Sequence, residues 1–346
     1  MPGRCQSGVS AAMSENMKNK KKSILFFNAR RRVNMAKKMI EYLKNRYTEY
    51  QLISSDTDYL DPISYVTDDF VVLPSIESQE FESVFLEVIK KKNIVGIIMW
   101  NDKDFAAIEK MRLKIEKLGC KILMPKEKKY EICNNKMLTD KFLRTHALYT
   151  PQIYENPDKI KKYPVIIKPK NGAGCVDVYK ADNLEEAIVF YKKVPNPIIQ
   201  EYIEGVHYTV DTYFDRCDGV LCSVPRKRIK VREAEVMIAK IEMQEEVMNV
   251  AQQLTKFFSE EGPMNIQVIL SVDDGKPYII DIHCRIGGGS ELSIEGGVPL
   301  HEWIIDDIIG GEKRIQYIVN DGLIMTRYFD AFFINENSSI KNNIKR

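Results

Sequence analysis

The amino-terminal third of the chain alternates short apolar runs with amphipathic segments. The apolar runs predict five strands, at 23–29 (SILFFNA), 50–56, 70–74, 94–100 and 120–125. Between them, apolar residues recur at helical spacing and predict helices at 33–47, 81–92 and 104–118. Strands that alternate with helices predict a parallel sheet covered on both faces. We therefore expect an α/β, Rossmann-like domain over residues 23–125.

The turn after the first predicted strand reads NARRRVN (28–34) and has no G-x-G-x-x-G motif. That motif supplies the tight turn and the close backbone approach that a pyrophosphate needs, so a dinucleotide site is not expected in this domain. The arginines at 30–32 either bind an anion at the start of the following helix or are exposed.

From about residue 126 the pattern changes. Helices are predicted at 134–148, 183–193 and 243–259. The strand and loop of 163–180 are followed by strands at 197–203, 206–215, 220–231, 264–270 and 277–286. Runs of strands with few helices predict an antiparallel or mixed sheet, and hence an α+β unit. We expect one lobe at 126–205, a second at 206–335, and polar tails at 1–22 and 336–346.

Charge and cysteine content exclude several functional classes. The chain has 51 Lys and Arg against 49 Asp and Glu, and this balance gives no overall field to attract nucleic acid or an anionic membrane. The seven cysteines are scattered and include no C-x-x-C pair, which predicts reduced thiols. No window reaches the roughly 18 apolar residues of a membrane span, and no signal-peptide core precedes SILFF. We expect a cytoplasmic protein with neither a nucleic-acid nor a membrane partner.

The segment YPVIIKPKNGAG places Lys168 at the end of an apolar strand and follows it with Gly172 and Gly174. Burying an ammonium group is unfavourable unless an anion meets it, and glycines let backbone N–H groups approach phosphate oxygens. The combination predicts a polyphosphate-binding loop, although the lysine precedes the glycines, which is the reverse of a Walker A loop. The alternative is a hairpin with a surface lysine.

Two neighbouring strand segments, MNIQVIL and YIIDIHCR, carry Gln267, Asp281, His283 and Arg285. Asp281 and His283 are two positions apart, so their side chains share one face of a strand. A carboxylate on such a face can hold Mg²⁺ against substrate phosphates, which Arg285 can also contact. The alternatives are a sheet-edge carboxylate with a basic partner for Asp281 and a hydrogen-bonded core histidine for His283.

Taken together, these segments resemble the ATP-grasp superfamily, and most closely the branch whose chains look like single modules of the carbamoyl-phosphate synthase large subunit. The resemblance extends from residue 23 to about residue 330 and rests on SILFFNARRRVNMAKKMIEYL, CNNKMLTDKFLRTHALYTP, PVIIKPKNGAG, IIQEYIEG, SVPRKRIKVREAE and DIHCRIGGGSELSIEGGVPL. In order, these are similar to the opening strand and basic turn, the first phosphate-lysine helix, the second phosphate lysine with its lid, the hinge between lobes, a second-lobe strand, and the metal strand with its glycine-rich turn. The resemblance implies a Rossmann-like pre-ATP-grasp domain followed by a two-lobed ATP-grasp domain.

The resemblance also implies a role for each candidate residue. Residues that would bind ATP are Lys136 and Lys168 at the phosphates, Gly172 and Gly174 in the lid, Glu201 and the backbone near Ile203 at the adenine, and His207 at the position of the ribose ligand. Residues that would surround the reacting group are Gln267 and Asp281 at Mg²⁺ with His283 beside them, and Arg285 with Lys168 as the catalytic cations.

Several positions depart from the usual pattern of that superfamily. Asp281 and His283 stand where Glu and Asn are usual, and imidazole is a poorer ligand for Mg²⁺ than for softer divalent ions. His283 is then either a group behind the ligands or a ligand that shifts the metal preference toward Mn²⁺. His207 replaces the acid that commonly holds the ribose, and Arg30 stands where a glycine is usual. Asp177 lies in the lid, where an acid is unfavourable unless it faces away from the phosphates.

Two further features were interpreted without the resemblance. Arg226, Lys227 and Arg228 either clamp a substrate carboxylate or phosphate or form a solvated strand face, and alternation places Arg226 and Arg228 on one face. Cys175 and Cys284 are interpreted as small packing or loop residues rather than nucleophiles, because the sequence assigns them no basic partner.

We expect an enzyme that joins a small-molecule carboxylate to an amine through an acyl phosphate, with ATP as the energy source and Mg²⁺ or Mn²⁺ as the metal. Positioning and electrostatic stabilisation dominate such phosphoryl transfer, which agrees with the abundance of cations among the candidates. Two alternatives remain open: a catalytically degenerate ATP-grasp fold that binds nucleotide as a sensor or interaction module, and a carboxylating or carbamoyl-phosphate-type enzyme that uses bicarbonate. A homodimer is the family-level expectation for assembly.

Overall fold

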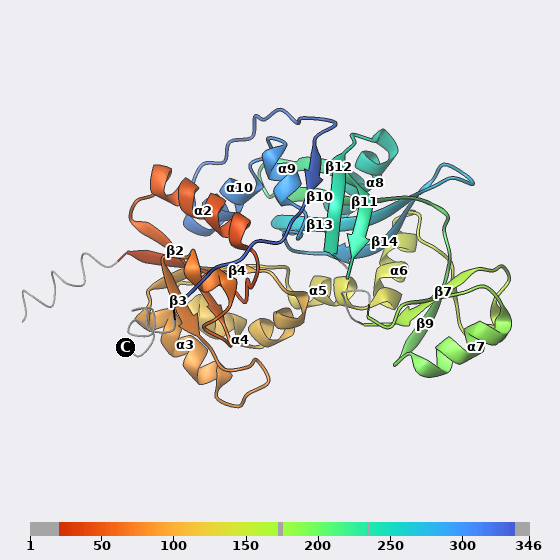
Figure 1. The fold of residues 1–346 in the computed structure, drawn as a ribbon, viewed down its shortest axis with the longest axis horizontal. Coiled ribbons are helices and arrows are strands. Elements are labelled where there is room, and N and C mark those ends of the chain that lie inside the picture. The colour runs from red at the N-terminus through yellow and green to blue at the C-terminus, as the bar shows by residue number, and fades with distance from the viewer. Residues whose placement is uncertain (1–20, 172–175, 234, 336–346) are drawn as a thin grey trace, which may run out of the picture. The chain divides into compact units, whose positions relative to one another are not determined.

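The structure of the protein, a computed structural model, describes residues 21–171, 176–233 and 235–335 (Figure 1). The chain forms two compact units. One comprises Met1–Ile98, Met111–Ile122 and Ile334–Arg346, and the other comprises Met99–Lys110 and Leu123–Phe333, as far as these ranges are described. The short segment 99–110 therefore belongs to the second unit although the chain around it belongs to the first.

The first unit is built on a five-stranded sheet with the order β3-β2-β1-β4-β5. Its strands are β1 (Lys22–Phe27), β2 (Tyr50–Asp56), β3 (Asp69–Val72), β4 (Ile94–Met99) and β5 (Lys121–Leu123). β1 pairs in parallel with β2, and β2 pairs in parallel with β3. The helices that alternate with them in sequence are α2 (Val33–Arg46), α3 (Phe81–Lys91) and α4 (Phe105–Lys117), with the short 3-10 helix η1 (Pro62–Tyr65) after β2. The first residues of α4 and the 3-10 helix η2 (Asp102–Asp104) before it lie in the segment that belongs to the second unit. The predicted Rossmann-like α/β arrangement is confirmed.

The sequence of this unit explains its packing. Ile24 to Phe27 on β1 are all 0% exposed, as expected for a strand covered on both faces. Helix α2 buries Met35, Met39 and Leu43, which recur every four residues and so form one face. On the sheet, the Phe27 ring lies 5.3 Å from that of Phe85 on α3.

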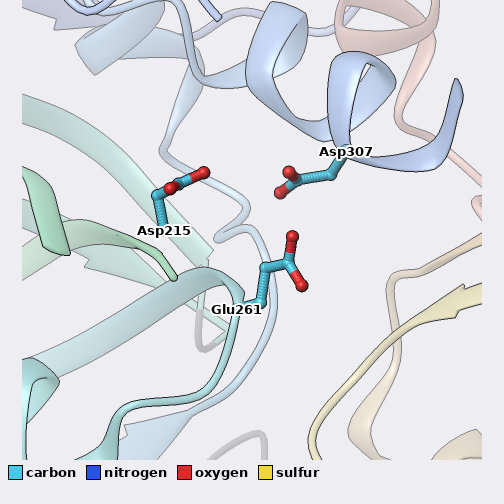
Figure 2. Close-up of side chains that lie close together, drawn as sticks. All are labelled: Asp215, Glu261 and Asp307. Atoms are coloured by element: carbon cyan, nitrogen blue, oxygen red, sulfur yellow. The ribbon is translucent and has the colours of Figure 1, made fainter. Parts of the chain in front are cut away.

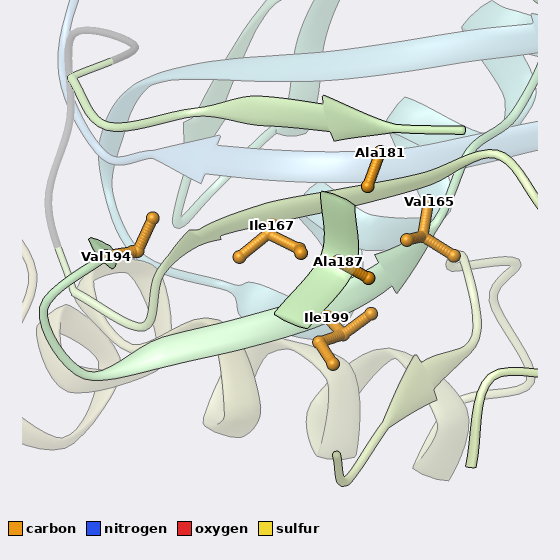
Figure 3. Close-up of a cluster of buried hydrophobic side chains, with 6 residues drawn as sticks. All are labelled: Val165, Ile167, Ala181, Ala187, Val194 and Ile199. Carbon is orange, nitrogen blue, oxygen red and sulfur yellow. The ribbon is translucent and has the colours of Figure 1, made fainter. Parts of the chain in front are cut away.

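The second unit contains a four-stranded antiparallel sheet with the order β6-β9-β7-β8. Its strands are β6 (Ile153–Tyr154), β7 (Val165–Pro169), β8 (Tyr179–Ala181) and β9 (Pro197–Glu201), with η3 (Pro157–Lys159) after β6. Helix α7 (Leu184–Lys193) packs on this sheet. The shared core consists of Val165, Ile167, Ala181, Ala187, Val194 and Ile199 (Figure 3).

A six-stranded sheet forms the rest of the second unit, with the order β14-β13-β10-β11-β12-β15. Its strands are β10 (Gly205–Asp215), β11 (Gly219–Arg232), β12 (Glu235–Ile241), β13 (Gly262–Ser271), β14 (Pro277–His283) and β15 (Ile324–Thr326), and all neighbours are antiparallel. Helices α8 (Glu245–Phe258), α9 (Glu291–Glu295) and α10 (Leu300–Ile309) accompany it. The predicted antiparallel sheet is confirmed. In the described ranges of the chain, none of the helices has the length and apolar character that crossing a membrane requires.

The helix expected at 134–148 is present with shorter bounds, and a helix that was not expected precedes it. Residues here form α5 (Glu127–Asn134) and α6 (Lys136–Thr145). Between them, Asn135 has an extended backbone, and its side chain accepts hydrogen bonds from the N–H groups of Met137 and Leu138 at 3.1 and 3.4 Å. An N-cap residue needs this non-helical backbone, so a new helix begins at Lys136.

Candidate functional site

The start of helix α6 is tied to the end of strand β7. The backbone N–H of Lys136 donates to the carbonyl of Lys170 at 3.0 Å. Asn135 and Asn171 form an isolated antiparallel bridge beside this bond. Lys168 lies on β7 two residues before Lys170, so these backbone contacts hold the helix that carries Lys136 against the strand that carries Lys168.

Strand β14 brings Asp281 into the same region, opposite Gln267 of β13. Burial alone would raise the pKa of the Asp281 carboxyl, but His283, and after it the ammonium groups of Lys136 and Lys168, lower that pKa to about 2. Charges affect one another in this way only when they are near. The structure therefore brings together the two lysines and the carboxylate, which come from α6, β7 and β14.

His283 is buried between two carboxylates and is 8% exposed. Its Nδ1 lies 3.0 Å from Oδ2 of Asp102, and its Nε2 lies 3.5 Å from Oδ2 of Asp281. Burial alone would lower the pKa of the imidazole, but the two carboxylates raise that pKa to about 9. The ring is therefore protonated at neutral pH when no metal is bound to it.

Arg285 is held by the same aspartate. Its Nε and Nη2 lie 2.9 and 2.8 Å from Oδ2 of Asp102, and its Nη1 donates to the carbonyl of Ile286 at 3.2 Å. Burial alone would raise the pKa of the Asp102 carboxyl, but Arg285 and His283 hold it far below its usual value. Asp102 thus stays ionised and links the predicted catalytic arginine to the predicted metal strand.

Sequence reasoning missed Asp102. The residue begins η2, directly after strand β4, and Asn101 caps this turn by accepting a hydrogen bond from the N–H of Lys103 at 3.3 Å. A usable signal was present, because polar residues that follow the carboxyl end of a parallel strand lie where open α/β sheets bind their ligands.

A second line of polar contacts runs from Gln267 toward strands β11 and β10. Nη1 of Arg228 donates to Oε1 of Gln267 at 3.3 Å, and Nε2 of Gln267 lies 3.5 Å from Nε2 of His283. Burial lowers the pKa of His207, and Arg228 lowers it further while Glu204 raises it. Gln267 therefore links Arg228 to His283, and the charge of Arg228 also acts on His207.

The residues predicted to meet the adenine lie at the end of strand β9. The backbone N–H of Glu201 donates to the carbonyl of Gln152 at 2.8 Å, and the Glu201 carboxylate accepts the N–H of Gln152 at 3.3 Å. Ile203 is 8% exposed and lies in the connection to β10. The contacts of Glu201 thus hold the strand end in place, and the adenine role remains a prediction.

The predicted lid is only partly described. Gly172, Gly174 and Cys175 lie outside the described residues. Asp177, which follows them, accepts a hydrogen bond from the hydroxyl of Tyr179 at 3.5 Å.

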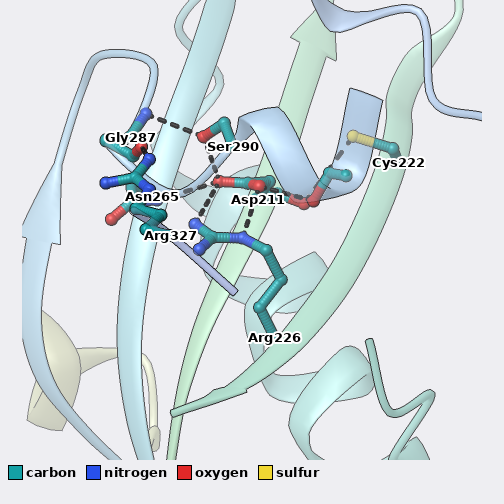
Figure 4. Close-up of polar contacts among 9 residues, drawn as sticks. Asp211, Cys222, Arg226, Asn265, Gly287, Ser290 and Arg327 are labelled. Carbon is teal, nitrogen blue, oxygen red and sulfur yellow. Dashed lines mark hydrogen bonds and ion pairs between the residues drawn. The ribbon is translucent and has the colours of Figure 1, made fainter. Parts of the chain in front are cut away.

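Arg226 is neither a substrate clamp nor part of a solvated face, which corrects both interpretations from the sequence. It is 1% exposed, and its Nε and Nη2 donate to the two carboxylate oxygens of Asp211 at 2.8 and 2.9 Å. Asn265 and Ser290 also donate to Asp211, at 2.9 and 2.7 Å (Figure 4). The hydroxyl of Ser293 donates to Asp211 at 2.6 Å. Strand alternation correctly places Arg226 on one face, but that face is the buried one.

The glycine-rich turn after Arg285 packs against this network. A Cβ atom at Gly289 would lie 2.2 Å from Nη1 of Arg226, and one at Gly287 would lie 2.2 Å from Nδ2 of Asn265. The N–H of Gly287 donates to Oγ of Ser290 at 2.9 Å (Figure 4). Glycine is needed here because the network approaches the backbone too closely for a side chain.

Three acidic residues gather at another place in the second unit. Within the described part of the chain, carboxylate oxygens of Asp215, Glu261 and Asp307 lie within 4.8 Å of one another (Figure 2). The Lys313 ammonium forms ion pairs with Asp215 and Asp307, and the hydroxyl of Tyr213 donates to Asp307. This lysine supplies the positive charge that the cluster requires.

Two cysteines lie next to the candidate site. Sγ of Cys133 on α5 is 2.9 Å from Sγ of Cys284, which follows β14. Burial raises the pKa of the Cys133 thiol, and the bond to Cys284 raises it further. Cys284 itself is 5% exposed, so its interpretation as a small packing residue agrees with its surroundings.

Comparisons with known proteins give a family for this arrangement. Residues 133–289 match the ATP-grasp domain, and residues 24–123 match the PylC-like, N-terminal domain. D-alanine–D-alanine ligase of Fusobacterium nucleatum is 26% identical over 258 residues, which cover 69% of this chain and 89% of the ligase.

Solved structures show the same fold. L-amino acid ligase from Bacillus licheniformis matches with a TM-score of 0.66 at 17% identity, over 87% of this chain and 75% of that chain. The biotin carboxylase domain of Hydrogenobacter thermophilus 2-oxoglutarate carboxylase, solved with MgADP, ADP and bicarbonate, matches with a TM-score of 0.70 at 16% identity, over 85% of this chain and 70% of that chain. Residues 24–123 are therefore a PylC-like N-terminal domain, and residues 133–289 are an ATP-grasp domain.

Proposed function

We propose that the protein is an ATP-dependent ligase that joins the carboxylate of one small molecule to the amine of another and releases ADP and phosphate. The convergence of Lys136, Lys168 and Asp281 carries this proposal, because two cations that face one carboxylate are suited to a triphosphate and its metal ion. Two of the relatives named above, D-alanine–D-alanine ligase and L-amino acid ligase, are amino-acid ligases, which supports the same class.

In the proposed reaction, a carboxylate oxygen of the acid attacks the γ-phosphorus of ATP, ADP leaves, and an acyl phosphate forms. The amine nitrogen then attacks the acyl carbon, the C–O bond to phosphate breaks, and the nitrogen loses a proton. Lys136 and Lys168 would bind the phosphates, and Arg285 would stabilise the charge on the transferred group. Asp102 and Ile286 take three of the five N–H groups of Arg285, and the others can face a phosphoryl oxygen.

The donor set of the predicted metal strand fits a divalent ion. Asp281 offers a carboxylate, Gln267 an amide and His283 an imidazole, and the last two side chains approach each other to 3.5 Å. When bound there, Mg²⁺ or Mn²⁺ would neutralise charge on the phosphates. The Asp281 carboxyl, whose side chain is 19% exposed, has a lowered pKa and is ionised, as a ligand of such an ion must be.

The test is ligation by the purified protein over a panel of acids and amines, followed by ADP release and by mass spectrometry of the products. We expect ADP and phosphate only when an acid and an amine are both present. Lys168→Ala should lower turnover by about 10²-fold or more, the usual cost of removing a group that stabilises transition-state charge. Lys162→Ala removes an exposed lysine, 3.8 Å from Asp273, and should leave turnover unchanged.

Other outcomes identify the alternatives. Bicarbonate-dependent ADP release without an organic acid would indicate a carboxylating enzyme. Stabilisation by nucleotide without turnover over the whole panel would indicate a nucleotide-binding module, a reading for which the relatives named above give no indication. If calorimetry detects neither ATP nor ADP binding with Mg²⁺ or Mn²⁺, the proposal is wrong.

A cytoplasmic location and a homodimeric state belong to the same proposal. The cysteines that the structure reports as free support a reducing compartment. One of the similar structures is a biotin carboxylase domain dimer, which supports assembly in pairs. Sedimentation of the purified chain at micromolar concentration tests the dimer.

A further inference from the structure

His283 is oriented by a carboxylate on the side away from Asp281. Asp102 lies 3.0 Å from Nδ1, and Asp281 lies 3.5 Å from Nε2. A histidine that binds a metal through one ring nitrogen usually donates its other N–H to a carboxylate, which fixes its tautomer and the orientation of its ring. The Asp102–His283 contact has this arrangement, and it turns Nε2 toward the predicted metal strand.

The other donors lie on the Nε2 side of the ring. Asp281 shares a strand face with His283, and Gln267 lies opposite Asp281 and 3.5 Å from Nε2. Neighbouring ligand atoms around an ion at about 2.1 Å stand about 3 Å apart, so a small contraction would bring these groups to coordination distance. Gln267 now presents its amide nitrogen, because Arg228 donates to its oxygen, and rotation of the amide would present the oxygen instead.

The donor set that results differs from an all-oxygen site. It contains one carboxylate, one amide and one imidazole, whereas Mg²⁺ prefers oxygen ligands and loses its waters reluctantly. First-row transition ions accept imidazole more readily than Mg²⁺ does. Asp102 contributes from the segment 99–110, and the same carboxylate oxygen also binds Arg285.

We propose that Asp102 is a positioning residue that makes His283 a metal ligand through Nε2, and that the site consequently favours Mn²⁺ over Mg²⁺ more strongly than an all-oxygen site would. The inference rests on the proposed function for the presence of a metal–nucleotide complex. Its test measures the binding and coordination of the metal ion directly.

The decisive measurement is electron paramagnetic resonance of Mn²⁺ added to chelator-treated protein, alone and with ADP. Loss of the free Mn²⁺ signal gives the dissociation constant, and added Mg²⁺ gives the ratio of the two affinities by competition. Pulsed measurements detect a directly bound imidazole nitrogen through its coupling to Mn²⁺. We expect this coupling in the unaltered protein. The central claim can therefore be tested even if the variants do not fold.

Three variants separate the roles. His283→Asn should abolish the nitrogen coupling and reduce the preference for Mn²⁺ over Mg²⁺. Asp102→Asn should weaken Mn²⁺ binding by about tenfold or more, the usual cost of losing a carboxylate behind a ligating histidine. Arg285→Lys keeps the Asp102–His283 contact and should leave the Mn²⁺ dissociation constant unchanged, although it should lower turnover.

Bound Mn²⁺ without histidine coupling would overturn the inference. So would tighter Mn²⁺ binding by His283→Asn, which would mean that the imidazolium competes with the ion. The proposed function fails separately: if Mn²⁺ binds with histidine coupling but no acid–amine pair supports ADP release, the metal assignment stands and the ligase assignment does not.

Discussion

At the scale of single residues, the carboxylates of Asp211 and Asp102 are each compensated by a set of donors. Asp211 is 2% exposed and accepts hydrogen bonds from Arg226 and from three neutral side chains. Asp102 is paired with His283 and Arg285 in the same manner. A buried charge is costly unless it is paired and hydrogen-bonded, so losing one member leaves the others uncompensated.

This rule gives a stability prediction for Arg226. Arg226→Met removes the cation from a pair whose side chains are 1% and 3% exposed, so it should lower the free energy of unfolding by about 3–5 kcal/mol. The measurement is urea unfolding followed by circular dichroism. Arg216→Met is the matched control: Arg216 lies 3.4 Å from Glu261, but its side chain is 69% exposed, so the change should stay below about 1 kcal/mol. Equal effects of the two substitutions would contradict the structural role given to Arg226.

The predictability of residues depends on how local their signals are. Lys136, Lys168 and Asp281 each lie in a short motif, so their convergence could be expected before the structure. Asp102 is 183 residues away from Arg285 in sequence, and only the fold brings the two together. Arg226 was interpreted wrongly because alternation along a strand gives the face of a side chain but not whether that face is covered.

At the scale of elements, register and caps place the site. The β13–β14 pairing sets Gln267 opposite Asp281, and an irregularity in register follows between Gln267 and Val268. The cap at Asn135 makes Lys136 the first residue of α6. Alternation of apolar residues predicts the strands, but no sequence pattern indicates the irregularity in register between Gln267 and Val268. Helix α5, which ends at Asn134 just before this cap, was not predicted from the sequence.

Three neighbouring strands of the six-stranded sheet, β10, β11 and β12, give a pH prediction through Glu242, which follows β12. The hydroxyl of Tyr208 on β10 donates to Glu242 at 2.5 Å, and Lys227 on β11 lies 3.5 Å from the same carboxylate. The hydrogen bond from Tyr208 lowers the pKa of Glu242 below its usual value of 4.5. Burial opposes this shift, and the charge of Lys227 adds to it. A carboxyl with a lowered pKa stabilises the folded state above its unfolded pKa, and this contribution is lost as pH falls through the folded pKa.

Glu242→Gln should therefore destabilise the protein at pH 7, and the difference from the unaltered protein should shrink as the pH falls below about 4.5. Urea unfolding of both proteins over this range measures the difference. In a Tyr208→Phe background the same substitution should show a weaker pH dependence, because the hydrogen bond with the largest effect on the pKa is gone. A difference that does not change with pH would exclude this contribution of Glu242.

At the scale of the whole molecule, the order of the chain and the division into units do not coincide. The alternation of strands and helices was sufficient to predict an α/β region followed by antiparallel sheets, because each element leaves a local pattern. The boundaries at 125, 205 and 335 remain predictions. Residues 99–110 belong to the second unit, although the residues before and after them in sequence belong to the first. A prediction that divides the chain into consecutive domains cannot include such an exchange.

The convergence of two lysines on one carboxylate predicts how nucleotide stabilises the whole protein. A ligand that binds only the folded state at 100 times its dissociation constant adds about 2.7 kcal/mol to the free energy of unfolding. Losing one charge-assisted contact to a phosphate costs about 1.5–3 kcal/mol of binding, so Lys136→Ala and Lys168→Ala should each remove at least about half of this stabilisation. Thermal unfolding with and without metal–ADP, at one fixed nucleotide concentration, measures the effect. Lys162→Ala, whose side chain is 68% exposed, should keep the full stabilisation. Unchanged stabilisation in both variants would show that Lys136 and Lys168 do not bind the nucleotide, although the charges of both act on Asp281.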